Sequence, residues 1–585
     1  MSQRQDREAD AELTDEQLAK CERAEVADKL NSPVPTQVVS NGEYMPPPQS
    51  AEQRRVEARV QELAGTASKK LGMSRRQFLA STGGMAAAFL AMNEVYGRFF
   101  NVSAIEMFEP EAYAATSPPA NLFTMDVQIH MIRGTSLAGV PFRALAQGPS
   151  ARDSGFAANP FNPGGLLDEL GSDWSVWNPK LVGKPVNGEM LRLVQFIKDV
   201  FFDSQLTVGV VSNMAPGTFT PPGGLPRAPR SVAEAESGNF LSGIQTAAVR
   251  NWVNELTGSR RLLGHAPLYP GVGNLEYLAY ALEELKPDAW KGYPNNRTAK
   301  RDNNPDTAFE LWSLDDEELA YPAYDFIARH ANFQRNPGQR NICVHQGFVS
   351  DPPTKPKGHP SAFPKAARDW PHLNFIIYHS CFSGGFGFQL WQRPYLDRIN
   401  AGILREGVPD LPWTTEFGQL LAPYPNVYAE LGATFGTCIV SFPTVAAHLM
   451  GQLMKYLGPD RICFGTDCIF WGGPQWQIEG MWRLEIPEEM RRQYGYPQLT
   501  QAAKRKILGL NSAKLYGVNP SSAPAPHGPY KPVPADYEAR IPSELKTLLE
   551  FPGFVADGMS KAKQRYLAEG ASPSNTRWGW VRTEA

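Results

Sequence analysis

Residues 122–130 read LFTMDVQIH, an apolar run that ends in a histidine. Seven similar runs follow along the chain, and most are rich in Val, Ile or Phe with little alternation between apolar and polar positions. Such runs are typical of parallel strands that are buried on both faces. The eight predicted strands cover residues 122–130, 206–213, 261–268, 289–294, 341–347, 373–380, 426–433 and 461–467.

Helical segments lie between several of these strands, such as LEYLAYALEELK at 275–286 and PTVAAHLMGQLMKYLG at 443–458. Eight strands alternating with helices predict an α/β fold, a (β/α)8 TIM barrel over residues 120–518, with a doubly wound sheet as the alternative. Long Gly- and Pro-rich insertions follow five of the strands, at the ends where barrel active sites are built. The C-terminal extension, residues 519–585, is expected to wrap the barrel.

Composition limits the class of protein. The chain has 585 residues, 42% hydrophobic and 20% charged, with a net charge of −3. These values are ordinary for a soluble globular protein and give no reason to expect a nucleic-acid surface. No apolar stretch approaches the ~20 residues that span a bilayer. The six cysteines form no C-x-x-C pair, which argues against a zinc ribbon or a thioredoxin-like site.

The N-terminal part of the chain has the features of an export signal. Residues 1–72 are polar, charged and Pro-containing, so we expect a disordered leader. The signal region, residues 73–115, contains SRRQFLA followed by the short small-residue run STGGMAAAFLAM at 81–92. Paired arginines before a weakly hydrophobic run resemble a twin-arginine export signal, and Ala112-Tyr113-Ala114 fits the A-x-A cleavage pattern.

This resemblance predicts a periplasmic or otherwise extracytoplasmic location, with the twin-arginine export machinery as a partner. Recognition would depend on Arg75 and Arg76. An amphipathic helix with two solvated arginines is the alternative. Met73 is a second candidate start, because MSRRQFLA is a complete signal opening. Twin-arginine export moves folded proteins, so any cofactor would be inserted in the cytoplasm before export.

Four polar residues lie at or near the carboxyl ends of separate predicted strands, namely His130, His345, His379 and Asp467. A lone histidine at a strand end is more often structural. Three imidazoles and a carboxylate that converge from strands 1, 5, 6 and 8 instead form an N/O site suited to zinc or another divalent ion. The sequence therefore predicts a metal site at this end of the barrel.

Short motifs occur in a specific order along the chain. They are Asp126-Val-Gln128-Ile-His130, LWSLDDEELAYPAYDFIARH (311–330), ICVHQGF (342–348), LNFIIYHSCFSGG (373–385), Gly465-Thr466-Asp467 and KRKILGLNSAKLYGV (504–518). Together they resemble the amidohydrolase-related family that contains aminocarboxymuconate semialdehyde decarboxylase and γ-resorcylate decarboxylase. The resemblance covers residues 120–518 and implies a metal-dependent barrel enzyme of the amidohydrolase superfamily.

The resemblance also implies roles for these residues. His130, His345 and Asp467 would bind one divalent ion, with zinc as the first choice and manganese or iron as alternatives. His379 would orient or deprotonate a metal-bound water, or contact the substrate. Asp467 would also move a proton. A divalent ion lowers the pKa of bound water from ~15.7 toward ~7, so the chemistry agrees with the ligand types.

The sequence departs from the family at Gln128, where the family has His or, in some members, Glu. An amide oxygen is a weaker ligand than imidazole, so Gln128 is a doubtful ligand. We expect the site to have a lower affinity for metal, to bind a different metal, or to be degenerate. Lys291 lies on the fourth predicted strand. Its strongest possible role is a contact with an anionic group of the substrate, and a lysine exposed to solvent at the end of the barrel explains the sequence equally well. His265 lies within strand 3 and is expected to be a hydrogen-bonded core residue.

Three functions remain open from the sequence. The first is a hydrolase that cleaves a C–N, C–O or C–C bond of a small organic substrate through a metal-activated water. The second is a non-oxidative decarboxylase on the same scaffold, because fold does not fix function. The third is a non-catalytic exported binding protein with a degenerate site, which Gln128 keeps open. A homodimer is compatible with all three.

Overall fold

The computed structural model of the chain describes most of the predicted barrel and the segment that precedes it. The described residues are 21–22, 32–36, 50–131, 193–212, 231–237, 241–268, 270, 274–294, 312–346, 358–383, 392–468, 473–522, 530–537, 539–542 and 582–583. Much of the expected strand-end insertions, including residues 134–190, lies outside these ranges, as does most of the C-terminal extension.

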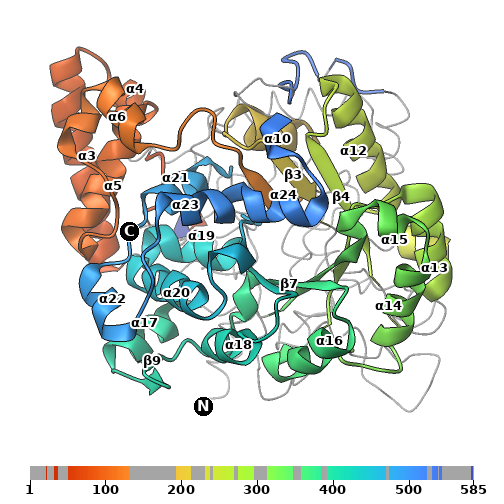
Figure 1. Ribbon diagram of the computed structural model, residues 1–585. Coiled ribbons are helices and arrows are strands. Elements are labelled where there is room, and N and C mark those ends of the chain that lie inside the picture. Colours follow the sequence, from red (N-terminus) through yellow and green to blue (C-terminus); the bar gives the residue numbers. More distant parts are fainter. Residues whose placement is uncertain are drawn as a thin grey trace.

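A sheet of eight parallel strands forms the centre of the molecule (Figure 1). The strands follow one another around the sheet in chain order, and each falls within a predicted strand. They are β2 (Met125–Ile129), β3 (Val208–Val211), β4 (Leu262–Pro267), β5 (Ala289–Gly292), β6 (Asn341–His345), β7 (Asn374–Tyr378), β10 (Val427–Glu430) and β11 (Ile462–Cys463).

The first and last strands meet and close the sheet. The Val127 amide donates to the Phe464 carbonyl at 3.1 Å, and the Asp467 amide donates to the Gln128 carbonyl at 2.9 Å. A parallel bridge pairs Ile129 with Cys468. These contacts confirm the predicted (β/α)8 barrel, because a doubly wound sheet would leave both edges open.

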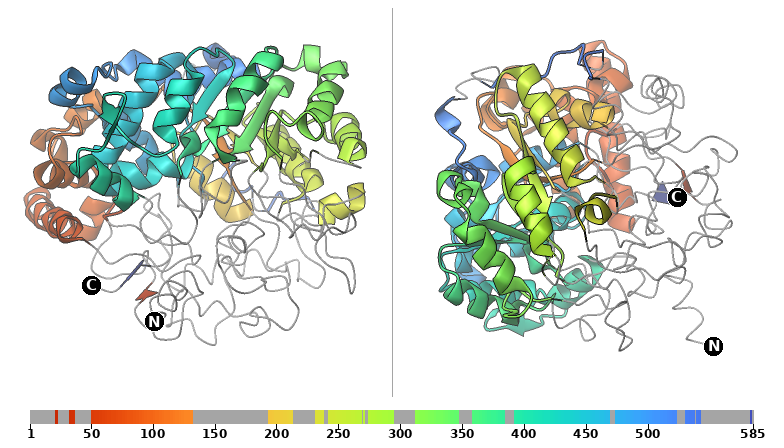
Figure 2. Two further views of the ribbon diagram at one scale, coloured as in Figure 1. Left: turned by 90° about the horizontal axis from the view of Figure 1, so that it is seen from below. Right: turned by 90° about the vertical axis from the view of Figure 1, so that its right-hand side faces the viewer.

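Helices cover the outside of the strands, as two further views show (Figure 2). Between β2 and β10 they are α10 (Leu193–Ile197), α11 (Val232–Ser237), α12 (Gly243–Thr257), α13 (Asn274–Tyr280), α14 (Ala320–Arg329), α15 (Asn332–Arg335), α16 (Phe363–Asp369), α17 (Gln392–Asn400) and α18 (Thr414–Leu421). After β10 they are α19 (Gly432–Ser441), α20 (Pro443–Tyr456), α21 (Gln475–Arg483), α22 (Glu488–Tyr494), α23 (Gln501–Arg505) and α24 (Asn511–Tyr516).

The barrel interior has its own apolar cluster, which includes Val127, Val208, Leu263 and Ile376. Tyr516 of α24 belongs to this cluster. Asn341, the first residue of β6, donates from Nδ2 to the Leu515 carbonyl at 3.0 Å. Helix α24 therefore lies at the amino ends of the strands, which leaves the carboxyl ends for the predicted site.

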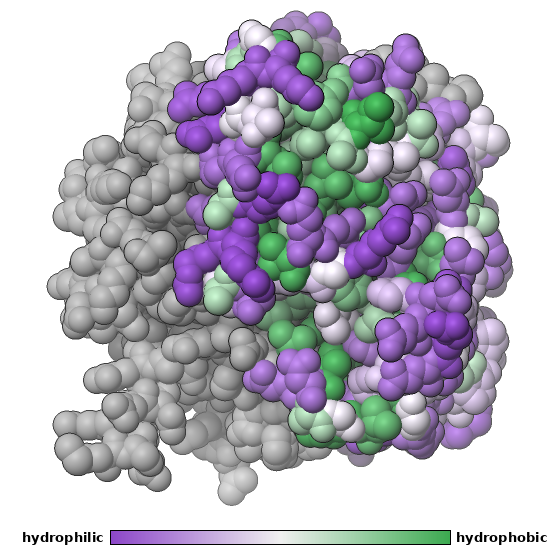
Figure 3. All heavy atoms as spheres, turned by 90° about the vertical axis from the view of Figure 1, so that its left-hand side faces the viewer, coloured by the Kyte–Doolittle hydropathy of each residue, from purple (hydrophilic) through white to green (hydrophobic). Residues whose placement is uncertain are grey.

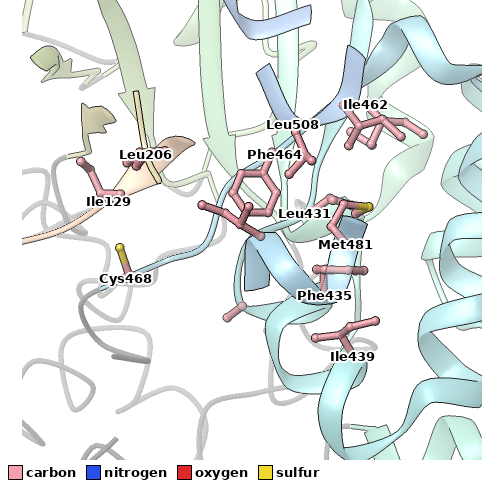
Figure 4. Packing of buried hydrophobic residues seen from close by; sticks show 14 of the residues in the cluster. Ile129, Leu206, Leu431, Phe435, Ile439, Ile462, Phe464, Cys468, Met481 and Leu508 are labelled. Carbon is pink, nitrogen blue, oxygen red and sulfur yellow. The ribbon is translucent and has the colours of Figure 1, made fainter. Parts of the chain in front are cut away.

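A second apolar layer joins the strands to the outer helices (Figure 4). Phe435 and Ile439 of α19 lie beside Met481 of α21, and Phe464 lies beside Leu508. All five side chains are buried. This layer fixes the segment between β11 and α21, which carries Asp467.

An N-terminal helical module, residues 50–116, precedes the barrel. It contains α3 (Ala51–Leu71), α4 (Arg75–Leu79), α5 (Thr82–Tyr96), the 3-10 turn η2 (Ala104–Met107) and α6 (Pro110–Thr116). The module lies at one side of the barrel, at the left of Figure 1. The predicted signal region therefore contains three helices. The paired arginines lie in α4, the apolar run lies in α5 and the cleavage pattern lies in α6.

The structure corrects the prediction of disorder for residues 51–72. Ser50 and Gln53 form a capping box, in which each side chain accepts from the other's backbone amide at 3.0–3.1 Å. Val56, Val60 and Ala64 then follow at four-residue spacing and are buried. This apolar stripe, hidden among many charges, makes α3 an amphipathic helix with a partner to pack on.

Several smaller features complete the described chain. Two-residue strands pair antiparallel as β1 (Cys21–Glu22) with β12 (Arg582–Thr583), and as β8 (Leu404–Arg405) with β9 (Val408–Pro409). Tyr530 of the C-terminal extension lies 6.3 Å from Phe123 between ring centroids, at the amino end of β2. Among the helices described, none is both long and apolar enough to cross a membrane.

Candidate active site

The site begins at β2, where Asp126 ties the first strand to the turn after β11. Asp126 Oδ1 accepts from the Gln128 amide at 2.9 Å and from the Thr466 amide at 3.1 Å. The Thr466 hydroxyl donates to Asp126 Oδ2. Burial raises the pKa of Asp126 to about 7. Asp126 therefore aligns β2 with the Gly-Thr-Asp turn and places Gln128 opposite Asp467.

His130 and Asp467 face each other across this seam. His130 Nδ1 lies 2.8 Å from the Ser212 carbonyl, which can only accept, so Nδ1 carries a proton. Nε2 of the same ring lies 2.9 Å from Asp467 Oδ1. Two acceptors at this distance repel each other unless a proton or a cation lies between them.

The side chain of Gln128 lies in the middle of the predicted residues. Its Nε2 is 3.0 Å from Asp467 Oδ1, 3.4 Å from His130 Nε2 and 3.4 Å from His379 Nε2. Its Oε1 is buried and has no hydrogen-bond partner within the described structure. The position that departs from the family is thus the centre of the site.

His379 and His345 form the other half of the site. His379 Nε2 lies 3.1 Å from His345 Nδ1, and the two rings meet edge to face. Burial lowers the pKa of both histidines well below the ordinary value, so both rings are neutral at neutral pH. We call Gln128, His130, His345, His379 and Asp467 the strand-end cluster.

The backbone is strained at this cluster. His379 (φ 61°), Ser380 (φ 51°) and Cys381 (φ 54°) are consecutive residues in the left-handed region, and Asp467 (φ 58°) is there too. Such conformations cost a residue other than glycine roughly 1–3 kcal/mol and persist where the surroundings enforce them. The two residues predicted to be catalytic, His379 and Asp467, are both held this way.

Glu430 at the end of β10 supports His379 from below. Glu430 Oε2 accepts from the His379 amide at 3.0 Å, and burial raises the pKa of this carboxyl well above its ordinary value. Its Oε1 is buried without a hydrogen-bond partner in the described chain. A Cβ on Gly465 would lie 1.7 Å from that oxygen, so the glycine of the Gly-Thr-Asp turn makes room for Glu430.

Lys291 on β5 lies inside the barrel and is buried. Its Nζ sits 3.2 Å from the Tyr378 ring centroid and 5.3 Å from that of Tyr293, which stacks on His345. Burial lowers the pKa of Lys291 to about 7, against the opposing influence of Glu430. Nζ has no hydrogen-bond partner among the described residues. Lys291 is therefore a charge beneath the cluster and not a solvated barrel-end lysine.

His265 is a core residue, as predicted. Its Nε2 lies 2.8 Å from the Tyr516 hydroxyl and its Nδ1 lies 3.2 Å from the Ser212 hydroxyl. Both ring nitrogens are thus engaged within the barrel.

The structure brings three of the predicted residues, His130, His379 and Asp467, around Gln128, with His345 one contact further away against His379. Within the described ranges, no group of three or more His, Cys, Asp or Glu side chains is arranged to hold a metal ion. Two of the three predicted ligands, His130 and Asp467, thus lie together, whereas the third, His345, lies against His379.

Sequence reasoning missed Glu430 and the two tyrosines around Lys291. Glu430 carried a signal, because an acid at the end of the Val- and Ala-rich run NVYAE is unusual in a buried strand. Tyr293 and Tyr378 carried none, because buried aromatic residues are common in any core.

A family model matches part of this barrel. A family model described as amidohydrolase matches residues 307–518, which contain β6, β7, β10 and β11. No curated protein matches the chain.

Solved structures with some likeness include three barrel enzymes. 2,6-Dihydroxybenzoate decarboxylase from Rhizobium is 13% identical, with a TM-score of 0.32 over 68% of this chain and 98% of that one. 5-Carboxyvanillate decarboxylase from Novosphingobium aromaticivorans, complexed with manganese, is 11% identical, with a TM-score of 0.34 over 69% and 98%. An amidohydrolase from Burkholderia multivorans is 12% identical, with a TM-score of 0.30 over 68% and 100%.

The family match covers His345, His379, Glu430 and Asp467, and the closed barrel supplies Gln128 and His130 from the first strand. The chain is thus similar to the amidohydrolase family over residues 307–518, and the barrel that contains this segment has the fold that the sequence predicted.

Proposed function

We propose that this enzyme is a metal-dependent hydrolase of a small organic substrate. The observation that carries the proposal is the close approach of His130 Nε2 and Asp467 Oδ1, 2.9 Å apart at the buried carboxyl ends of the first and last strands. An imidazole nitrogen and a carboxylate oxygen brought together in this way are donor types that a divalent ion binds.

The donor set fits one divalent ion. His130 supplies a nitrogen and Asp467 an oxygen, and Gln128 supplies the orphaned amide oxygen. A carboxamide carries its oxygen and nitrogen at nearly equivalent places, so a turn about its last bond exchanges them. His345 is the further predicted ligand. Mixed N/O sets suit zinc, with manganese and iron as alternatives. Such an ion would polarise a substrate carbonyl and lower the pKa of water.

The chain's own residues account for the remaining steps. The other carboxylate oxygen of Asp467, Oδ2, would accept a proton from the attacking water and return it to the leaving group. His379, neutral and fixed through its amide by Glu430, is placed to orient the water or the substrate. The strained backbone at His379 and Asp467 keeps both groups in place before substrate arrives.

A non-oxidative decarboxylase is the second candidate, and Lys291 favours it. Its buried Nζ adds positive charge beneath the cluster, which would attract a carboxylate substrate. In that reaction the bond to the carboxylate carbon breaks, carbon dioxide leaves, and a proton takes its place. Asp467 or a neutral histidine of the cluster is placed to deliver that proton.

One experiment separates the two candidates. The purified enzyme is incubated with matched sets of esters, lactones, amides and aromatic acids, and both hydrolysis products and bicarbonate are measured. Hydrolysis without bicarbonate release supports the first proposal, and bicarbonate release from aromatic acids supports the second. If neither set is turned over by metal-loaded enzyme, both proposals are wrong.

We also propose twin-arginine export to the periplasm. Arg75 and Arg76 open α4 on the exposed surface, where a receptor could reach them. Replacing both by lysine should leave the protein in the cytoplasm, as cell fractionation would measure. Unchanged export of the double variant would contradict this proposal.

A further inference from the structure

The N-terminal helical module covers a helix of the barrel that would otherwise face water. All nine residues of α21 are buried, on every side of the helix. An outer helix of a barrel normally leaves one polar face in solvent. The outer face of α21 is apolar or ion-paired, and the module supplies the partner for that face.

A buried ion network joins the module to α21. Arg483 donates from Nε to Glu479 Oε2 at 2.9 Å, within α21. Arg483 also donates from Nη1 to Glu106 Oε2 and to the Asn101 carbonyl of the module, both at 2.9 Å. The Tyr113 hydroxyl of α6 donates to Glu479 Oε1. We call Arg483, Glu479, Glu106 and Tyr113 the interface network.

The backbones of the two parts are also paired. The Asn101 amide donates to the Arg483 carbonyl at 2.8 Å, and the Glu485 amide donates to the Phe99 carbonyl at 2.7 Å. Trp482 Nε1 donates to the Thr116 carbonyl at 3.1 Å. A cut after Ala114 followed by loss of the module would break both of these backbone bonds.

The apolar run that resembles a signal is used inside the module. Nine residues of α5 are buried, including Phe89 and Met92. Gly83 allows a close approach to η2, because an added Cβ would lie 2.6 Å from the Met107 carbonyl oxygen. Seen from the module's side of the molecule, polar side chains cover much of the surface, with a band of apolar ones between them (Figure 3).

We propose that the N-terminal helical module is a permanent part of the mature enzyme and that the bond after Ala114 is not cut. That bond lies within α6, whose helical backbone would have to unwind to enter a protease. Cleavage and loss of the module would remove Glu106, Asn101 and Tyr113 and would expose the face of α21 that the module covers, with Arg483 paired only to Glu479. The same segment thus presents Arg75 and Arg76 at the surface and completes the fold.

Intact-mass measurement tests the proposal on the full chain. The active enzyme is isolated from whichever cell fraction contains it, and its N-terminus is determined. The proposal expects Arg75, Arg76 and Tyr113 to be present in the active species. Active, stable enzyme that begins at Ala115 would overturn it.

A cut placed after folding tests the interface itself. A protease site is introduced at the exposed residues Ala120 and Asn121, and the folded protein is cleaved there. The two fragments should co-elute in size-exclusion chromatography without denaturant. Glu106→Ala should release the module, whereas Glu111→Ala, at an exposed position of the same module, should not. Separation of the unmodified fragments, with the barrel still folded, would overturn the proposal.

Discussion

In the interface network opposite charges touch: Arg483 lies 2.9 Å from Glu106 and 2.9 Å from Glu479. Beneath the strand-end cluster, Lys291 Nζ and Glu430 Oε1 are buried and make no hydrogen bond within the described chain. Both regions are polar and enclosed, so burial alone does not separate them. The difference is that Arg483, although its Nη2 has no hydrogen-bond partner in the described chain, contacts two opposite charges, whereas Lys291 and Glu430 form no ion pair among the described residues. Unpaired buried groups of this kind are rare in structural regions and gather at functional sites.

The largest expected effect comes from the strand-end cluster. Asp467→Asn removes the charge that faces His130 and the group proposed to move a proton. We expect turnover to fall by about 100- to 10,000-fold, the range typical of general acid–base groups. Steady-state kinetics on the metal-loaded protein measures it. Asp460→Asn, which alters only an exposed ion pair with Lys506, is the matched control. Full turnover in Asp467→Asn would remove this residue from the site.

The next effect should come from the interface network. Glu106→Ala leaves Arg483 partly uncompensated in a buried place, and breaking a buried ion pair from one side costs about 3–5 kcal/mol. Chemical denaturation measures the free energy of unfolding. Glu111→Ala removes an exposed acid from the same module and should change stability little. Equal stability of the two variants would show that the network does not hold the parts together.

Lys291 predicts a pH dependence that the interface network lacks. Its pKa is about 7 in the folded enzyme and 10.5 ordinarily, so the unfolded chain binds more protons between these values. The contribution of Lys291 to stability should therefore rise with pH from about 7 toward about 10.5, at on the order of 1.4 kcal/mol per pH unit, and should not change below pH 7. Lys291→Met should remove this contribution in chelator-treated protein and leave that of buried Lys504, whose pKa is lowered to about 8, whereas the exposed Lys514→Met should leave both. A slope between pH 7 and 8 that is unchanged in Lys291→Met would contradict the assignment.

Substitution of Gln128 should give the smallest change, and this change should affect only the affinity for metal. Gln128→His restores the family's donor and should tighten metal binding by about 10- to 100-fold, the size of effect that neighbouring groups exert on metal sites. We expect no gain in turnover, because the pocket is built around the amide. Chelator competition and a turnover assay on both proteins measure the two quantities. Recovery of both binding and turnover from an inert parent would instead mean that the native site has decayed.

The sequence predicted the barrel well because its strands carry a local signal. Each predicted run overlaps an observed strand, and the closure between Val127 and Phe464 follows once eight strands are present. Strand-end residues were predictable for the same reason, since parallel strands bring their carboxyl ends together. Helix α3 was not, because its narrow stripe of Val56, Val60 and Ala64 lies within a strongly charged segment.

The interface network could not be predicted from the sequence at all. Arg483 and Glu106 are separated by 377 positions, and each looks like an ordinary surface residue in its own segment. Their pairing depends on where the module docks, which no local pattern specifies. Glu430 could be predicted in part. The sequence shows that it ends a buried strand, but it does not show that Glu430 accepts a hydrogen bond from the His379 amide.

Elemental analysis of the full-length enzyme, purified from its native compartment, tests the central claim most directly. We expect one divalent ion per chain in the native protein, and loss of most of that metal in Asp467→Asn and His130→Ala. Asp460→Asn should keep the full amount. Native protein that turns over substrate at full rate without a divalent ion, or an Asp467→Asn protein that keeps its metal, would contradict the assignment of the strand-end cluster as a metal site.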